Sequence, residues 1–164
     1  MEAPKLGILP TWDLSAYFSG KDDPRILSVL AESKKQAEQF AARWRGSITD
    51  VSLAGDVSKA LREQEAILQE AVKPLFYASA LHTTDETNQE YGALAQKTEA
   101  LYTEICNEFT FLSLNLLKLT NETLQRFIHS AELENYRHHL SHLLKTKPHR
   151  LEEREEQILN DKAL

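Results

Sequence analysis

The residues with the clearest chemical potential are the histidines of the segment His138-His139-Leu140-Ser141-His142. His138 and His142 are four residues apart, so on a helix both imidazoles project from one face and could bind a metal ion. The spacing is that of the zinc-binding signature His-Glu-x-x-His, but His139 stands where the signature has its glutamate base. Catalytic zinc also needs a third protein ligand, and no obvious one lies nearby. The pattern therefore favours a solvent-exposed helix face over a metal site.

Other catalytic patterns are missing from the sequence. None of the six histidines has a glutamate three positions before it, as a di-iron helix bundle requires. The five glycines are scattered singly and form no phosphate-binding loop. Cys106 is the single cysteine, and its neighbours Glu104 and Glu108 would raise the pKa of a thiol rather than activate it. We predict no catalytic, cofactor-binding or metal-binding residue in this chain, and a buried, structural role for Cys106.

Charge and hydropathy limit the kinds of partner. The chain has 164 residues, with 19 Lys and Arg against 25 Asp and Glu, which gives a net charge of −6. An acidic surface repels nucleic acid and anionic lipid, and the basic stretch 137–150 is followed by four glutamates that neutralise it. The longest stretch without a charged residue has 11 residues, far below the roughly 18 of a membrane helix. We expect no nucleic-acid or membrane partner. Because the N-terminus has no secretory signal pattern, we expect a cytoplasmic location.

Apolar residues recur at helical spacing along most of the chain, and Gly and Pro are scarce, with five of each. The first helix is predicted to start at Asp22-Asp23-Pro24 and to end at Gly46. The second should begin near Gly55-Asp56, with a kink or an interruption at Pro74. The third and longest follows Asp85 and continues to about Leu119.

Shorter helices are expected after Thr120-Asn121 and from Ser130 to Leu144, the latter closed by Pro148, and a charged helix is expected over Leu151–Leu164. No segment alternates with the period of a strand. We therefore predict an all-α fold, an antiparallel bundle of about five to six helices. Its expected organisation is an irregular aromatic N-terminal arm over residues 1–21 and a helical lobe over residues 22–164.

Two apolar segments need a surface to cover them. The arm contains Trp12, Leu14, Tyr17 and Phe18, and we expect it to pack over another part of the protein. The run from Phe109 to Leu117 is apolar nearly all round its helix, which predicts a bundle core. A docking surface for a partner is the alternative interpretation of this run.

The sequence resembles the N-terminal part of oligoendopeptidase F, a family of thimet-oligopeptidase-like zinc metallopeptidases. The resemblance covers essentially the whole chain and is carried by motifs towards its two ends. These motifs are Trp12-Asp13-Leu14-Ser15 with Tyr17, Asp23-Pro24, Arg43-Trp44-Arg45-Gly46, Leu133-Glu-Asn-Tyr136-Arg137-His138 and the run from Lys147 to Leu159.

The resemblance implies a cytosolic enzyme that cleaves oligopeptides with a zinc ion. The family binds zinc through His-Glu-x-x-His and a further downstream glutamate, and this sequence contains no such motif. The resemblance therefore assigns no catalytic or metal residue to this chain, and places His138 and His142 outside the catalytic helix. It implies a C-terminal metallopeptidase catalytic domain as partner, zinc in the full-length enzyme and an oligopeptide as its substrate.

Two functions from different classes follow. In the first, the chain is the N-terminal lobe, or a truncated product, of an oligoendopeptidase F-like enzyme; it encloses the peptide channel and is inactive alone. In the second, it is a freestanding helical module that docks a protein or peptide through the apolar segment Phe109–Leu117 and the aromatic arm. A metal-binding bundle that uses His138 and His142 is a third and weaker hypothesis.

Overall fold

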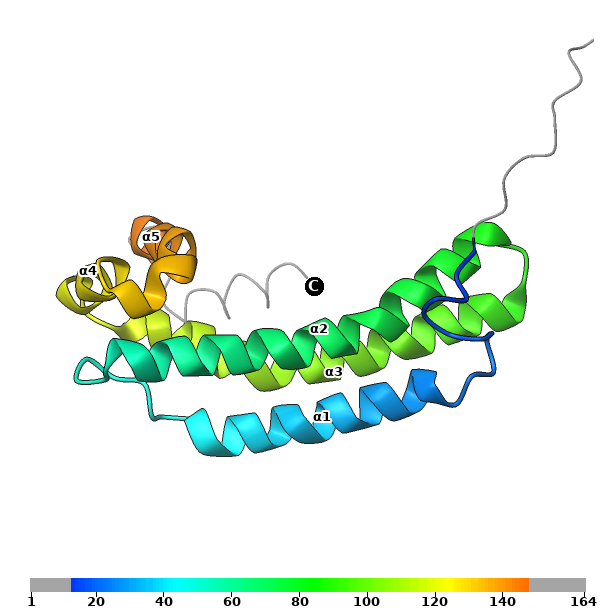
Figure 1. The fold of residues 1–164 in the computed structure, drawn as a ribbon, viewed down its shortest axis with the longest axis horizontal. Coiled ribbons are helices and arrows are strands. Elements are labelled where there is room, and N and C mark those ends of the chain that lie inside the picture. The colour runs from blue at the N-terminus through cyan, green and yellow to red at the C-terminus, as the bar shows by residue number, and fades with distance from the viewer. Residues whose placement is uncertain (1–12, 148–164) are drawn as a thin grey trace, which may run out of the picture. The chain divides into compact units, whose positions relative to one another are not determined.

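The computed structural model describes residues 13–147, and all regular structure in this range is helical (Figure 1). The predicted all-α fold is confirmed for these residues. Trp12, Pro148 and the predicted helix Leu151–Leu164 lie outside them. The helices are α1 (Arg25–Trp44), α2 (Ala54–Thr84), α3 (Gln89–Lys118), α4 (Asn121–Ile128), the 3-10 helix η1 (Ala131–Tyr136) and α5 (Arg137–Thr146).

The described residues form two compact units. Unit 1 contains residues 13–36 and 67–106, and unit 2 contains residues 37–66 and 107–147. Helices α1, α2 and α3 each contribute residues to both units. The predicted division into an arm (1–21) and a lobe (22–164) stays a prediction.

In unit 1, the aromatic arm packs onto α2. Phe18 is 5% exposed, and its ring meets that of Tyr77 edge-on with the centroids 5.0 Å apart. Together with Ile26 these rings form a small apolar cluster, which Leu14 joins from the arm. The arm therefore covers a surface as predicted, although Tyr17 remains 55% exposed.

Asp23 organises the start of α1. One carboxylate oxygen accepts a hydrogen bond from the backbone N–H of Arg25 at 2.9 Å, and the other accepts from the N–H and hydroxyl of Ser19 at 2.9 and 3.0 Å. The Arg25 guanidinium also binds this carboxylate, at 2.5 Å. These donors, Arg25 above all, hold the pKa of Asp23 well below its usual range. The predicted acidic start signal is thus present, and Asp23 provides it.

A kink or an interruption was predicted at Pro74. Helix α2 continues through this residue, so the interruption is absent, and the kink stays a prediction. A proline removes one helical hydrogen bond and crowds the preceding turn. Here the residues around it are held by tertiary packing, because Ala71, Tyr77 and Ala78 are at most 4% exposed. Burial of these neighbours stabilises the helix against the local cost of the proline.

Helix α3 follows Asp85 as predicted and begins at Gln89, but with 30 residues against 31 for α2 it is not the longest helix, so that part of the prediction is wrong. The side-chain oxygen of Asn88 accepts from the backbone N–H of Glu90 at 3.0 Å and of Tyr91 at 3.3 Å. Asp85 instead closes the preceding turn, where it accepts from the N–H of Thr87 at 3.1 Å. Asp and Asn can both cap a helix. Here the course of the chain through the turn makes Asn88, and not Asp85, the cap of α3.

The core of unit 2 is built around Phe40. This residue is fully buried, and its ring lies 5.0 Å from that of Phe109 and 5.9 Å from that of Phe111, centroid to centroid. Leu112 and Leu116, one and two turns further on, are each 1% exposed. The apolar run of α3 is thus largely bundle core, as predicted. Helix α1 ends before Gly46, whose φ of +77° is the left-handed cap expected of this glycine.

The last described helices follow the predicted order with one correction. Thr120 caps α4, since its hydroxyl accepts from the N–H of Thr123 at 3.2 Å, and α4 packs against α5 (Figure 1). The single helix predicted from Ser130 to Leu144 is wrong. It is divided into η1 and α5, and Leu133 in η1 has non-helical angles (φ −111°, ψ 16°). Leu133 is fully buried, so packing of its side chain outweighs regular helix geometry there.

We expect Phe40→Ala to lower the free energy of unfolding by about 3–5 kcal/mol, because it leaves a cavity among buried rings. Urea unfolding followed by circular dichroism measures this. Phe76→Ala is the matched control: Phe76 is 70% exposed, so its truncation should change stability by no more than about 0.5 kcal/mol. Equal losses from the two variants would contradict the proposed core.

The Asp23 contacts predict a pH dependence. Because the folded-state pKa of Asp23 is lowered, its stabilising effect is present above the ordinary carboxyl pKa of about 4 and is lost as pH falls below it. The urea midpoint of Asp23→Asn should therefore lie below that of the natural chain at pH 6, and the gap should narrow towards pH 2.5. Asp22→Asn, at an exposed neighbour, should show little gap at either pH; a gap for Asp23→Asn that is independent of pH would contradict the assignment.

Candidate functional site

The predicted histidine pair forms no metal centre with a third ligand. His138 and His142 lie exposed on α5. Across residues 13–147 the structure brings together no group of three His, Cys, Asp or Glu side chains that could hold a metal ion. His139 stands between these two residues in the sequence. Its pKa is lowered by desolvation first and then by the nearby His142, while Glu65 acts to raise it. The three histidines of this segment therefore lie exposed on α5, while Leu140 between them is buried; that the chain binds no metal stays a prediction.

Cys106 is partly exposed, so the prediction that it is buried is wrong. Cys106 directly follows the fully buried Ile105 on α3. Consecutive residues of a helix point in different directions around its axis, so Cys106 does not share the buried position of Ile105. A hydrogen bond joins it to Tyr102, and burial together with this bond raises the pKa of that tyrosine. Nothing here activates the thiol as a nucleophile.

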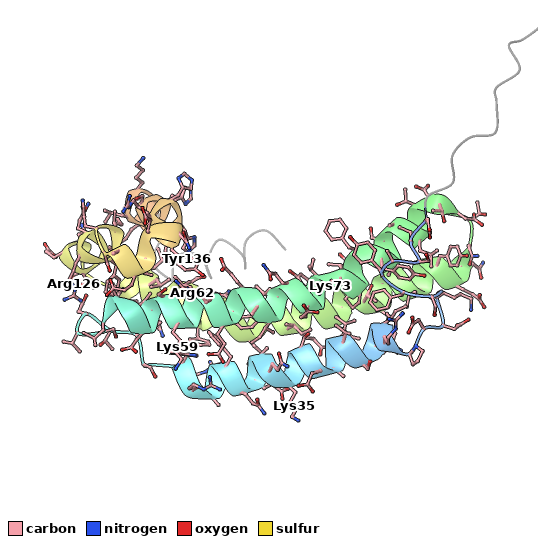
Figure 2. All side chains as sticks on the ribbon, viewed as in Figure 1. Lys35, Lys59, Arg62, Lys73, Arg126 and Tyr136 are labelled. Carbon is pink, nitrogen blue, oxygen red and sulfur yellow. The ribbon has the colours of Figure 1, made fainter. Side chains whose placement is uncertain are left out.

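A hollow of about 600 Å³ opens in unit 2, between the first turns of α2 and the 3-10 helix η1. Figure 2 shows Lys59 and Arg62 on α2, with Tyr136 close to Arg62. The lining residues are Gly55, Ser58, Lys59, Arg62 and Glu63 of α2 and Glu132 of η1. The sequence marked Gly55 as the start of the second helix, but none of these six residues was predicted to belong to a site.

Tyr136 holds the two walls of this hollow together. Its side chain is buried, and its hydroxyl donates a hydrogen bond to the Glu65 carboxylate on α2 at 2.6 Å. Burial first, and then this bond, raise the pKa of Tyr136 to about 12. Leu133 is fully buried at the same 3-10 helix. These contacts fix η1 against α2 and so place Glu132 across from Lys59 and Arg62.

The charges around the hollow are unevenly neutralised. Glu63 binds the Arg43 guanidinium at 2.7 Å and the indole N–H of Trp44 at 3.0 Å. Glu132 accepts a hydrogen bond from the Ser130 hydroxyl, which lowers the pKa of its carboxyl. Within the described part of the chain, no acidic group lies within 4.0 Å of either Lys59 or Arg62. Among residues 13–147, Lys59 and Arg62 thus line the hollow without an ion-pair partner.

A second hollow, of about 310 Å³, lies in unit 1 between α2 and α3. Leu75, Phe76 and Ser79 line it from α2, and Ala95 and Glu99 line it from α3. Phe76, which lines this hollow, is itself largely exposed. This surface is mainly apolar and has no cluster of chemically reactive side chains.

Part of the signal for the unit 2 hollow was present in the sequence. Lys59 and Arg62 are three residues apart, which places them on one face of a helix. The identity of the wall opposite them could not be predicted, because Glu132 follows 70 residues later. No helix among residues 13–147 is both long and apolar enough to cross a membrane.

Comparison with known proteins connects this helical chain to a class of peptidases. The family described as Oligopeptidase F matches residues 115–164. Oligopeptidase PepF of Bacillus subtilis is 29% identical over 150 residues, which cover 91% of this chain and 22% of the relative. Group B oligopeptidase PepB of Streptococcus agalactiae is 27% identical and an oligoendopeptidase F homolog of Borreliella burgdorferi 24% identical, each over 90% of this chain and 24% of the relative. No solved structure gives a significant match.

The chain thus spans less than a quarter of the length of these relatives, and it matches their N-terminal part. The chain is therefore similar to the N-terminal region of these peptidases. The similarity is to proteins named oligopeptidase and oligoendopeptidase F, the family that the motifs towards the two ends of the sequence resemble.

The bond between Tyr136 and Glu65 gives a test of the site's construction. Tyr136→Phe should lower the free energy of unfolding by about 0.5–1.5 kcal/mol, the usual net value of one hydrogen bond. The raised pKa of Tyr136 also means that its stabilising effect is present below pH ~10 and is lost as pH rises towards 12. Urea unfolding at pH 7 and pH 11 measures both effects. Tyr17→Phe, at a 55% exposed site, should change neither; an equal response would rule out the assigned role.

Proposed function

We propose that this chain is the N-terminal helical lobe of an oligopeptide-cleaving zinc metallo-endopeptidase. The observation that carries the proposal is its alignment, over nine-tenths of its length, with the N-terminal part of oligopeptidase PepF. In this proposal the zinc ion and its ligands belong to a separate C-terminal catalytic domain. Zinc there would activate the water that hydrolyses the peptide bond.

The lobe's role in this proposal is steric. A packed helical wall opposite a catalytic domain forms a channel, and a narrow channel admits short unfolded peptides while it excludes folded proteins. The packed cores of units 1 and 2 support this role, because each is built from helices with a buried interior. The proposed partners are thus the catalytic domain and the oligopeptide substrate. A cytoplasmic location stays a prediction.

The alternative, a freestanding docking module, receives less support. It was based on the apolar run Phe109–Leu117 and on the aromatic arm. Phe109, Phe111 and Leu112 are buried in unit 2, and Phe18 is buried in unit 1. The side chains that suggested a docking surface are therefore mainly used in the protein's own core.

A chimera tests the proposal. The matched N-terminal part of Bacillus subtilis PepF would be replaced by this chain, and cleavage of a fluorescence-quenched oligopeptide would be measured. We expect chelator-sensitive cleavage well above that of PepF from which the same part is deleted, because the lobe completes the channel and orients the peptide. The 164-residue chain alone should show no cleavage.

Two results would overturn the proposal. One is chelator-sensitive peptidase activity of the purified 164-residue chain. The other is a folded, zinc-loaded chimera that is no more active than the deleted enzyme. Zinc content and a cooperative unfolding transition of the chimera establish that the second comparison is valid.

A further inference from the structure

We propose that the unit 2 hollow is a binding site for a carboxylate group of an oligopeptide. That the carboxylate belongs to a peptide rests on the proposed function; that the hollow binds a carboxylate rests on its own geometry. The residues that would bind it are Ser58, Lys59 and Arg62 of α2, with Gly55 at the first turn of the same helix.

The first argument is the unpaired charge of Lys59 and Arg62. They lie three residues apart on α2, a spacing that places both residues on one face of a helix, and both line the hollow. Elsewhere in this unit, Arg43 is used in an ion pair, with Glu63 at 2.7 Å. No described acidic side chain pairs with Lys59 or Arg62, although acidic residues outnumber basic ones in the chain, 25 to 19. Two free cations at one hollow favour an anion there.

The second argument is the hydroxyl of Ser58, which is independent of charge. Ser58 is 5% exposed and lines the hollow. Among the described residues its hydroxyl has no hydrogen-bond partner, and the hydroxyl oxygen is not fully buried but keeps access to solvent. A polar group that is buried except towards a hollow can be satisfied by a ligand in that hollow. A carboxylate oxygen would accept its hydrogen bond.

The backbone of α2 adds to the positive electrostatic potential at the hollow. Gly55 lies in the first turn of α2, a helix of 31 residues, and the N-terminus of a helix carries a partial positive charge. The backbone carbonyl of Leu53 accepts from the N–H groups of Asp56 and Val57 at 3.1 and 3.3 Å, and Asp56 places one acidic side chain in this same turn. The first turn of α2, the two cations and the Ser58 hydroxyl thus all belong to the lining of one hollow.

The acidic residues of the rim select among anions. Glu63 and Glu132 line the same hollow, and both would repel the closely spaced charges of a nucleic acid. They can instead accept hydrogen bonds from the N–H groups of a peptide whose single carboxylate lies at Lys59 and Arg62. This combination fits one carboxylate on an otherwise neutral or basic peptide.

The test uses the full 164-residue chain labelled with nitrogen-15, titrated with N-acetylated penta-alanine as the free acid and as the C-terminal amide. We expect saturable shifts at the backbone amides of residues 55–62 with the free acid, and about tenfold weaker binding of the amide, as loss of a charged hydrogen-bonded contact predicts. Added NaCl should weaken binding of the free acid. A third peptide, amidated at its end with one internal glutamate, shows whether a side-chain carboxylate is also accepted.

The variant pair is Lys59→Gln with Arg62→Gln, and the matched control is Lys35→Gln with Lys73→Gln, two cations that do not line the hollow. The first pair should lose about tenfold in affinity for the free acid, and the control should lose none. Ser58→Ala should weaken binding less than the double charge variant. Lys59→Arg with Arg62→Lys keeps both charges and should retain measurable binding, which separates loss of charge from loss of fold.

Equal binding of acid and amide, or unchanged binding by the Lys59→Gln and Arg62→Gln variant, would overturn the site. Inorganic phosphate that binds as tightly as the peptide would overturn the assignment to a peptide carboxylate. These outcomes are separate from those of the chimera. If the chimera is active but the hollow binds no peptide, only the proposed carboxylate site is contradicted. If the hollow binds the peptide but the chimera is inactive, only the proposed role of the lobe is contradicted.

Discussion

The candidate site depends on one hydrogen bond, from the buried hydroxyl of Tyr136 to the carboxylate of Glu65. Glu65 is exposed on α2, whereas Tyr136 ends the 3-10 helix η1 and is 8% exposed. A buried hydroxyl is costly without a partner, so the carboxylate of α2 must lie where Tyr136 can reach it. This requirement holds η1 against α2. It thereby makes Glu132 of η1 and the first turns of α2 opposite walls of one hollow.

The helix ends that could be predicted are those with a local physical cause. Asp23, Gly46 and Thr120 act on backbone groups within a few residues, and all three have the roles that their types suggest. The failures have tertiary causes. Pro74 does not interrupt α2 because its neighbours are buried, and the helix expected after Ser130 is divided because the buried Leu133 adopts non-helical angles.

The site was harder to predict than the fold, and the reason is physical. The histidine segment attracts attention because its spacing is a local property, yet a metal centre needs a third ligand, which only tertiary structure can supply. Lys59 and Arg62 carry the opposite kind of signal. Their spacing is ordinary for an exposed helix face. Their importance lies in the lack of an ion-pair partner among the described residues, although Glu63 and Glu132 line the same hollow, and in the buried Ser58. Neither property can be obtained from the order of residues.

Lys59 and Arg62 have no ion-pair partner among the described residues because of where they lie, and not because the chain has too few acidic residues. Acidic residues are in excess, and nearby acids such as Glu63 already bind other groups, here Arg43 and Trp44. If the free cations at the hollow bind the carboxylate of a peptide, the lobe does more than narrow a channel. An anchored charged group sets which peptide bond lies at a given distance from it. The length of the substrate would then be selected by an electrostatic contact on the lobe, while the catalytic domain supplies the zinc chemistry.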